Sequence, residues 1–242
     1  MKRQRLLALV LSMMLMLSAC GTPSSNTPPS NNTTDTPNAT APDNSTPAEN
    51  MPSSSGDSIT DDFLKTITAE TAEAKGVCGA DLTWYYQDNV LVIKGTGEMN
   101  DYEDAMPPWY DKDDEYGLHT QIHWLIVDEG TASIGRNAFR WGRALSKVQL
   151  PNTLQKIKQN AFGGCPLTDI VIPSSVVEIE DSAFWEANSE RGLNSVTFMG
   201  DAPEGTEHVI RYAMVTNGTV YYSGSGFDEL IAEFPDINWV KQ

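Results

Sequence analysis

The apolar positions of residues 59–75 recur every three to four residues, as they do along one face of a helix. Asp61 and Asp62 lie near the start of this segment, where acidic side chains favour a helix. We therefore predict a short amphipathic helix over residues 59–75 that packs on the part of the chain after it. Its apolar positions are Ile59, Phe63, Leu64 and Ile67.

Two stretches rich in aromatic and β-branched residues follow, Leu82–Tyr86 and Val90–Lys94. They are separated by Gln87-Asp88-Asn89, a sequence typical of a turn, and together they predict a β-hairpin. The glycines of Gly95-Thr96-Gly97 are expected to end it.

From residue 122 onward, one pattern of apolar positions recurs every 22 to 26 residues. Each copy begins with an apolar-x-apolar pair, which suits a strand with one buried face. An isoleucine follows seven residues after the pair, and an Ala-Phe pair comes four to five residues later. A period in the twenties indicates a repeat architecture. Val196 and Phe198 begin a fourth copy that does not complete.

One such copy cannot enclose its own apolar side chains, but stacked copies can, with their strands paired in parallel. We therefore expect Phe139, Phe162 and Phe184, which end the three complete copies, to be aligned in one column within a shared core. The core residues expected from the repeats are Leu125, Val127, Ile134, Phe139, Val148, Leu150, Ile157, Phe162, Ile170, Ile172, Ile179, Phe184, Val196 and Phe198.

These copies resemble the BspA-like leucine-rich repeats of bacterial surface proteins. Residues 167–184 follow that family's pattern nearly throughout, and Cys165 occupies the family's cysteine position. The first copy departs from the pattern, because Trp141-Gly142-Arg143 replaces the Gly-Cys region and Asp128 replaces the proline. The resemblance implies adhesion to host matrix proteins or to other cells, through the extended face that stacked repeats offer.

The flanks resemble the modules that precede and close such repeats, with Gly95-Thr96-Gly97 before them and Gly200-Asp201-Ala202-Pro203 after them. The expected fold class is a β-rich leucine-rich-repeat solenoid, a right-handed coil of short parallel strands, with an N-terminal β-hairpin cap and a small α/β C-terminal cap. The expected domains are a lipoprotein signal peptide (1–19), a lipidated cysteine with a disordered tether (20–58), a capping module of helix and hairpin (59–121), the repeats (122–203) and the C-terminal cap (204–242).

The N-terminus has the composition of a secretory signal. Three basic residues precede an apolar run over residues 6–17, which is too short to span a bilayer comfortably. The segment ends in Leu17-Ser18-Ala19-Cys20, which resembles the lipobox of bacterial lipoproteins. The resemblance implies that Cys20 becomes the first residue of the mature chain and carries lipid. We therefore expect an extracytoplasmic protein, lipid-anchored at the cell membrane or cell surface.

Composition and charge limit the classes of partner that we expect this protein to bind. Of the 36 residues from Gly21 to Gly56, 27 are Ser, Thr, Pro or Asn, so this stretch can bury almost nothing and is expected to be a flexible tether. Three of the 16 basic residues lie in the signal, against 33 acidic residues in the chain, which leaves a net charge of −20 for the mature protein. Nucleic acid is therefore excluded as a partner, because phosphate binding needs clustered Lys and Arg. The expected partners are the membrane, through lipid on Cys20, and a protein or glycan ligand.

No motif in the sequence indicates an enzyme. The chain lacks Gly-x-Ser-x-Gly, His-Glu-x-x-His, Cys-x-x-Cys and a Walker loop, so we expect neither catalytic residues nor a cofactor. Cys78 and Cys165 lie in unrelated contexts, and we favour two buried thiols. A disulfide between them stays open, since an extracytoplasmic compartment would permit one.

Two groups of residues raise the question of a metal. The acidic side chains between residues 101 and 115 could attract calcium, but Tyr116 and Ile122 stand where an EF-hand needs glycine and glutamate, which favours a solvated loop. His119 and His123 have the spacing of a metal pair on a helix, but residues 122–128 predict a strand, so we expect exposed histidines. No metal site is expected.

Exposed aromatic residues are the best candidates for binding. Trp84 and Trp109 match the resembled capping pattern and are expected in the core, whereas Trp141, Trp185 and Tyr110 form the candidate binding surface. A packing role stays open for the two tryptophans of this surface.

The expected function is a cell-surface binding module that adheres to host or cell-surface proteins or glycans through the repeat face. Two alternatives stay open. One is a structural, envelope-associated lipoprotein without an external ligand. The other is a surface polysaccharide hydrolase, for which the abundant carboxylates name no catalytic pair.

Overall fold

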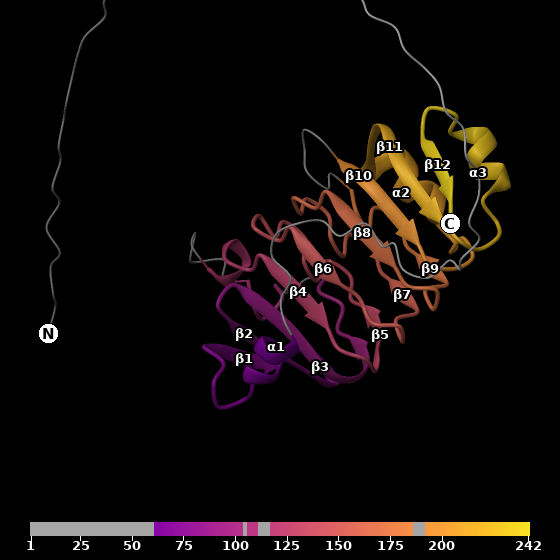
Figure 1. The fold of residues 1–242 in the computed structure, drawn as a ribbon. Helices are drawn as coiled ribbons and strands as arrows, with labels where there is room; N and C mark the ends of the chain where they lie inside the picture. Colours follow the sequence, from indigo (N-terminus) through magenta and orange to yellow (C-terminus); the bar gives the residue numbers. More distant parts are fainter. Residues whose placement is uncertain (1–60, 104–105, 111–116, 186–191) are drawn as a thin grey trace, which may run out of the picture. The chain divides into compact units, whose positions relative to one another are not determined.

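Strands make up most of the regular secondary structure, in two rows that run through successive repeats (Figure 1). The computed structural model describes residues 61–103, 106–110, 117–185 and 192–242. The signal sequence, Cys20, the tether and Ile59 therefore lie outside the described residues, as do the acidic residues of segments 104–105 and 111–116. Within the described residues, every helix is too short or too polar to cross a membrane.

The expected β-hairpin is present at the start of the sheet. Strands β2 (Gly79–Gln87) and β3 (Val90–Met99) are antiparallel, and β1 (Ala74–Val77) pairs with the other side of β2. Asp88 and Asn89 turn the chain with φ angles of 49° and 66°. A two-residue hairpin turn of type I′ requires a positive φ at both of its central residues.

The glycines at residues 95–97 do not end the hairpin, contrary to the expectation from the sequence. Strand β3 continues through them and changes its parallel partner, from β4 (Trp124–Val127) in its first half to β5 (Thr131–Ile134) in its second. Gly95 has a φ of 120°, and a Cβ atom there would lie 2.0 Å from the carbonyl oxygen of Asp81. Glycine is therefore what permits the close approach of β2 and β3 at this bend.

The helix expected over residues 59–75 is shorter than predicted. Helix α1 is Asp61–Thr66, and the end of the predicted helix belongs to β1 instead. The threonines after α1 account for the difference. The backbone N–H of Thr68 donates a hydrogen bond to the Thr71 hydroxyl at 2.8 Å, and such local bonds compete with those of a helix.

The apolar residues of this segment nevertheless pack on the next part of the chain, as expected. Ile67 is fully buried in a small cluster with Val90, Val92 and Ile126, and Phe63 and Leu64 pack against that cluster. The face of β3 and β4 that points away from the main core is therefore covered by the segment that precedes the hairpin.

The first row of parallel strands carries the apolar-x-apolar pairs of the repeats, with equivalent positions in register. Leu125 is paired with Val148, and Ile170 is paired with Val196. The row continues past the fourth pair, which the sequence presented as an unfinished copy, because Val220 and then Trp239 extend the same register. After β3 and β4, its strands are β6 (Lys147–Gln149) and, in a second sheet, β8 (Asp169–Ile172), β10 (Leu193–Phe198), β11 (Met214–Tyr222) and β12 (Asn238–Lys241).

The second row of parallel strands was not anticipated from the sequence. It consists of β5, β7 (Lys156–Ile157) and β9 (Glu178–Ile179), which follow the second half of β3. The recurring isoleucines form its register, since Ile134 is paired with Ile157 and Ile157 with Ile179. Each repeat thus contributes one strand to each row.

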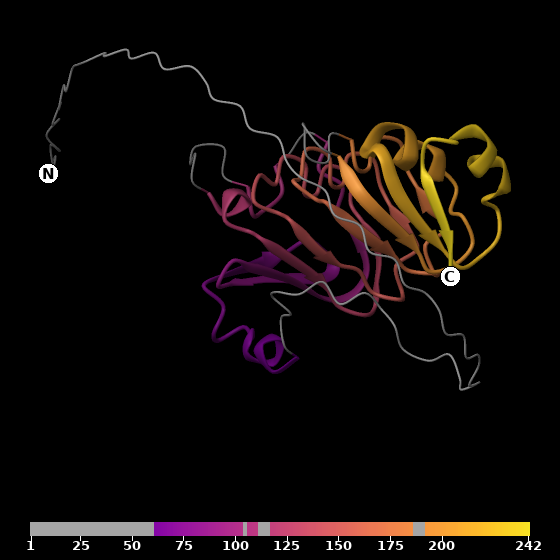
Figure 2. The same ribbon diagram turned by 45° about the horizontal axis from the view of Figure 1, so that its top comes forward.

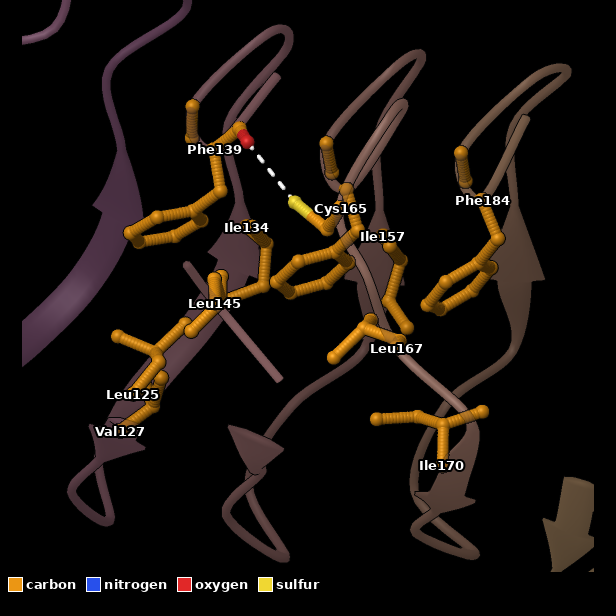
Figure 3. Packing of buried hydrophobic residues seen from close by; sticks show 14 of the residues in the cluster. Leu125, Val127, Ile134, Phe139, Leu145, Ile157, Cys165, Leu167, Ile170 and Phe184 are labelled. Carbon is orange, nitrogen blue, oxygen red and sulfur yellow. Dashed lines mark hydrogen bonds between the residues drawn. The ribbon is translucent and has the colours of Figure 1, made fainter. Parts of the chain in front are cut away.

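The three phenylalanines of the repeats form one column, as predicted. The ring centroids of Phe139 and Phe162 are 5.6 Å apart with an interplanar angle of 8°, and those of Phe162 and Phe184 are 5.4 Å apart at 14°. Trp109 extends the stack, with its ring 4.9 Å from that of Phe139. In Figure 3, Phe139 and Phe184 occupy equivalent places in their turns.

Most of the residues expected in the repeat core are fully buried. Val148 and Leu150 are only partly buried, although both pack against the core. Beyond the repeats, helices α2 (Thr206–Ala213) and α3 (Asp228–Glu233) lie beside the last strands in both views of the ribbon (Figures 1 and 2).

The two thiols are free and buried, as favoured from the sequence. Burial raises the pKa of Cys78 and of Cys165 to about 12. Neither thiol is therefore a nucleophile in the folded protein near neutral pH.

Candidate functional site

The turns that follow the phenylalanine column bring two tryptophans together. Trp141 follows Phe139 in the first repeat, and Trp185 follows Phe184 in the third. Their ring centroids are 6.1 Å apart with an interplanar angle of 77°, and the side chains are 40% and 37% exposed. Two of the candidate binding residues thus form one exposed aromatic pair, although 44 positions separate them in the sequence.

The turn of the second repeat forms hydrogen bonds with the backbone of both tryptophans. The Trp141 N–H donates to the Gly163 carbonyl oxygen at 2.8 Å, and the Gly164 N–H donates to the Trp185 carbonyl oxygen at 2.8 Å. A Cβ atom at Gly164 would lie 2.2 Å from the Trp141 ring, and Gly164 has a φ of 73°. The ring of Trp141 therefore lies against bare backbone, which any larger residue at position 164 would displace.

A hollow of about 300 Å³ opens beside Trp141. It has aromatic and apolar walls together with three polar side chains. This volume lies at the lower end of the range for small-molecule sites. The lining residues are Tyr102, Glu103, Met106, Pro107, Tyr110, Asn137, Arg140 and Trp141.

Tyr110 is half-buried at this hollow, and it stacks on His119 with 3.9 Å between ring centroids and an interplanar angle of 24°. The expectation that both histidines are exposed was therefore wrong for His119, which is buried. The short 3-10 helix η1 (Leu118–Thr120) carries its imidazole onto the tyrosine ring. His123 is exposed, as expected.

The other aromatic candidates divide as the sequence suggested. Trp84 and Trp109 are buried in the core, where the Trp109 indole N–H donates to the Ala138 carbonyl oxygen at 2.9 Å. Tyr86 and Tyr102 are also buried. The exposed aromatic pair thus lies in the turns and not on the first row of strands, whose outward positions in β6 and β8 include Gln149 and Val171.

Most basic side chains of the repeats are paired with carboxylates. Lys147 pairs with Asp169 at 3.1 Å, for example, and Arg136 pairs with Glu103 on the rim of the hollow. Arg140 is different, because no carboxylate among the described residues forms an ion pair with it. Its guanidinium lies 5.7 Å from the centroid of the Trp141 ring.

The acidic residues that raised the question of calcium make bonds within the protein where they are described. Burial alone would raise the pKa of Asp101, but the hydrogen bond from the Arg136 backbone and the ammonium of Lys158 lower it below its ordinary value. Within the described residues, no group of three or more His, Cys, Asp and Glu side chains is arranged to hold a metal ion. The acidic positions at 104 and 111–115 lie outside the described residues.

Sequence reasoning missed Arg140, Gly164 and the hollow. The departure of Trp141-Gly142-Arg143 from the repeat pattern was a signal for Arg140, since it falls in the same turn. The hollow had no such signal, because residues 102–103, 106–107 and 110 meet Asn137, Arg140 and Trp141 only in the folded chain.

Comparisons with known proteins agree with the repeat pattern. Residues 116–210 match the family model described as the BspA type leucine rich repeat region, in six copies. No curated protein matches the chain significantly.

Solved structures of bacterial leucine-rich repeat proteins are also similar. A protein of Eubacterium ventriosum is 21% identical over 52% of this chain and 44% of its own, with a TM-score of 0.30. The pneumococcal vaccine antigen PcpA is 16% identical over 66% of this chain and 47% of its own, with a TM-score of 0.41. A leucine-rich repeat protein of T. pallidum is 18% identical over 62% of this chain and 86% of its own, with a TM-score of 0.30.

The chain spans less than half the length of the first two of these proteins. Residues 116–210 therefore carry leucine-rich repeats of the BspA type.

Proposed function

We propose that this protein is a cell-surface binding module that holds a protein or glycan through the turns of its repeats. The observation that carries the proposal is the exposed pair of Trp141 and Trp185, which stands beside a hollow that also contains Arg140. Tryptophan and arginine are the residues most enriched where binding energy is concentrated. The two rings are 40% and 37% exposed, so part of each surface is free to contact a partner.

The arrangement of the repeats supports a binding role over a catalytic one. The two rows of parallel strands, wound as a right-handed solenoid with a cap at each end, would hold the turns at fixed spacing. Backbone hydrogen bonds already join successive turns, from Phe139 to Ala161 and from Phe162 to Ala183, each at 2.8 Å. A rigid series of turns suits a preformed surface for a partner. We accordingly propose no enzymatic activity.

The N-terminal sequence supports a location at the cell surface. Lipid on Cys20 would anchor the chain, and residues 21–56 would act as a flexible tether. A tether of this length would separate anchor and repeats by roughly 30 Å on average and by roughly 100 Å when drawn out as polyproline II. That reach would carry the repeats away from the membrane toward an external partner.

Binding of the full chain to arrays of extracellular matrix proteins and of glycans tests this proposal. A synthetic peptide with the sequence of residues 21–56 serves as the competitor. We expect the full chain to bind at least one class of ligand and the peptide to leave that binding unchanged. If the peptide competes for all binding, the tether is the binding element and the proposal is wrong. If no ligand is bound on either array, the alternative of a structural lipoprotein is favoured.

A further inference from the structure

Trp141 is flanked by two arginines that form no ion pair within the described part of the chain. Arg140 and Arg143 are both exposed, and neither forms an ion pair with any described carboxylate. This is unusual in a chain with 33 acidic and 16 basic residues. The turn from Phe139 to Leu145 itself carries two basic side chains and no acidic one.

A guanidinium that has no ion pair and lies beside an aromatic ring favours a particular kind of ligand. Arginine presents parallel N–H donors that match the two oxygens of a carboxylate, and this bidentate pairing is stronger than that of a neutral hydrogen bond. Arg140 lies within 5.7 Å of the Trp141 ring, so one ligand could place a carboxylate on the former and an apolar face on the latter.

The hollow limits the size of the ligand and specifies its other groups. A volume of about 300 Å³ admits a single ring and its substituents, not a folded element of a partner. Glu103 on the rim is an acceptor when ionised, whereas the Asn137 Nδ2 already donates to the Tyr102 carbonyl oxygen and the Asn137 Oδ1 is buried. Glu103 and Arg140 together call for a ligand that carries a hydroxyl donor as well as a carboxylate.

We infer that the hollow and the turn beside it bind a carboxylate-bearing sugar residue of an acidic glycan. The inference rests on the proposed binding function and names the ligand class of the same site. The C–H face of the sugar lies on Trp141, its carboxylate pairs with Arg140, and a hydroxyl donates to Glu103. Arg143 attracts the carboxylates of neighbouring sugar residues in the same glycan.

An acidic peptide fits these groups less well. It would also satisfy Arg140, but a run of carboxylates would approach Glu103 with no hydroxyl donor to offer. The net negative charge of the protein would also repel a run of carboxylates over longer distances than it would repel a glycan that carries one charge on every second residue.

Titration calorimetry on the full chain tests the inference with three probes. They are a hyaluronan hexasaccharide, which carries uronate carboxylates, a neutral hexamer of N-acetylglucosamine and a peptide of glutamates with as many charges as the hyaluronan. The R140Q/R143Q variant removes both charges with little change in size. R140K keeps the positive charge but loses the parallel N–H donors of the guanidinium. R211Q is the matched control, because Arg211 is an exposed arginine of α2 that is paired with Glu233.

We expect hyaluronan to bind more tightly than the neutral hexamer and the peptide. R140Q/R143Q should weaken that binding by at least tenfold, R140K by several-fold, and R211Q not measurably. The inference is overturned if hyaluronan does not bind, if the neutral hexamer or the peptide binds as tightly, or if R140Q/R143Q binds hyaluronan like the unaltered chain. Should the chain bind a matrix protein or a neutral glycan while it ignores uronates, this inference fails and the proposed function stands.

Discussion

The Sγ atom of Cys165 donates a hydrogen bond to the carbonyl oxygen of Phe139, 3.0 Å away in the turn of the preceding repeat (Figure 3). Both residues are buried, and the thiol is fully enclosed. The bond is the second that this buried carbonyl oxygen accepts, beside the one from the Gly142 N–H at 2.9 Å. The cysteine at this position of the repeat links one turn to the next.

Replacement of this cysteine should destabilise the protein. Cys165→Ala removes a buried sulfur and one of the two donors to the Phe139 carbonyl oxygen, which keeps the Gly142 N–H at 2.9 Å, so we expect a loss of roughly 1 kcal/mol in the free energy of unfolding. Cys165→Ser keeps a donor and should lose less. Urea unfolding of the two variants measures the difference. An alanine variant as stable as the unaltered chain would mean that the thiol merely fills space.

Stability should depend on alkaline pH through the two thiols. Burial raises the pKa of Cys78 and Cys165 from 9.0 to about 12. The unfolded chain loses these protons near pH 9 while the folded chain keeps them, so the contribution of the thiols is constant below pH 9 and decreases as the pH rises from 9 toward 12. Urea unfolding from about pH 7 to about pH 11 should show this decrease.

The matched control for this pH dependence is the Cys78→Ala/Cys165→Ala variant, which is less stable at every pH but lacks both titrating groups. Its free energy of unfolding should fall less steeply above pH 9. Parallel curves for the two proteins would show that other groups produce the alkaline loss.

Gly164 and its neighbour Gly163 should respond very differently to alanine. At Gly164 a Cβ atom would meet the Trp141 ring at 2.2 Å, and its φ of 73° is unfavourable for alanine, so Gly164→Ala should cost roughly 1–3 kcal/mol. At Gly163 the nearest atoms to a Cβ would be 3.6 Å away, so Gly163→Ala should change stability by less than about 1 kcal/mol. Urea unfolding gives both values. Tryptophan emission should also shift in Gly164→Ala alone, and equal effects at both positions would contradict the packing described.

The repeat pattern predicted the parallel strands and the aligned rings, because each depends on a period that is visible in one sequence. Phe139, Phe162 and Phe184 stack since the copies between them differ by a single residue in length. The second row of strands escaped prediction for a related reason. Strands β7 and β9 have two residues each, too few to show an alternation of apolar and polar positions.

Other features depended on contacts that no local pattern records. The threonines after α1 end the helix through side-chain bonds, although the apolar spacing continues to Ile67. His119 is buried because Tyr110, nine positions earlier, supplies a ring for it to stack on. For the candidate site, the sequence identified the exposed tryptophans, but their partners Arg140 and Gly164 required the structure.

The turns that carry Trp141 and Trp185 form the proposed binding surface. The most direct test compares dissociation constants for a ligand found on the arrays between the unaltered chain and three variants, Trp141→Ala, Trp185→Ala and Tyr212→Ala. Tyr212 is an aromatic residue of α2, 53% exposed and outside this surface, so its variant is the control. We predict that each tryptophan variant binds at least roughly sevenfold more weakly, the equivalent of more than 1 kcal/mol, and that Tyr212→Ala binds like the unaltered chain. Unchanged affinity in both tryptophan variants, with their folds intact, would contradict the account.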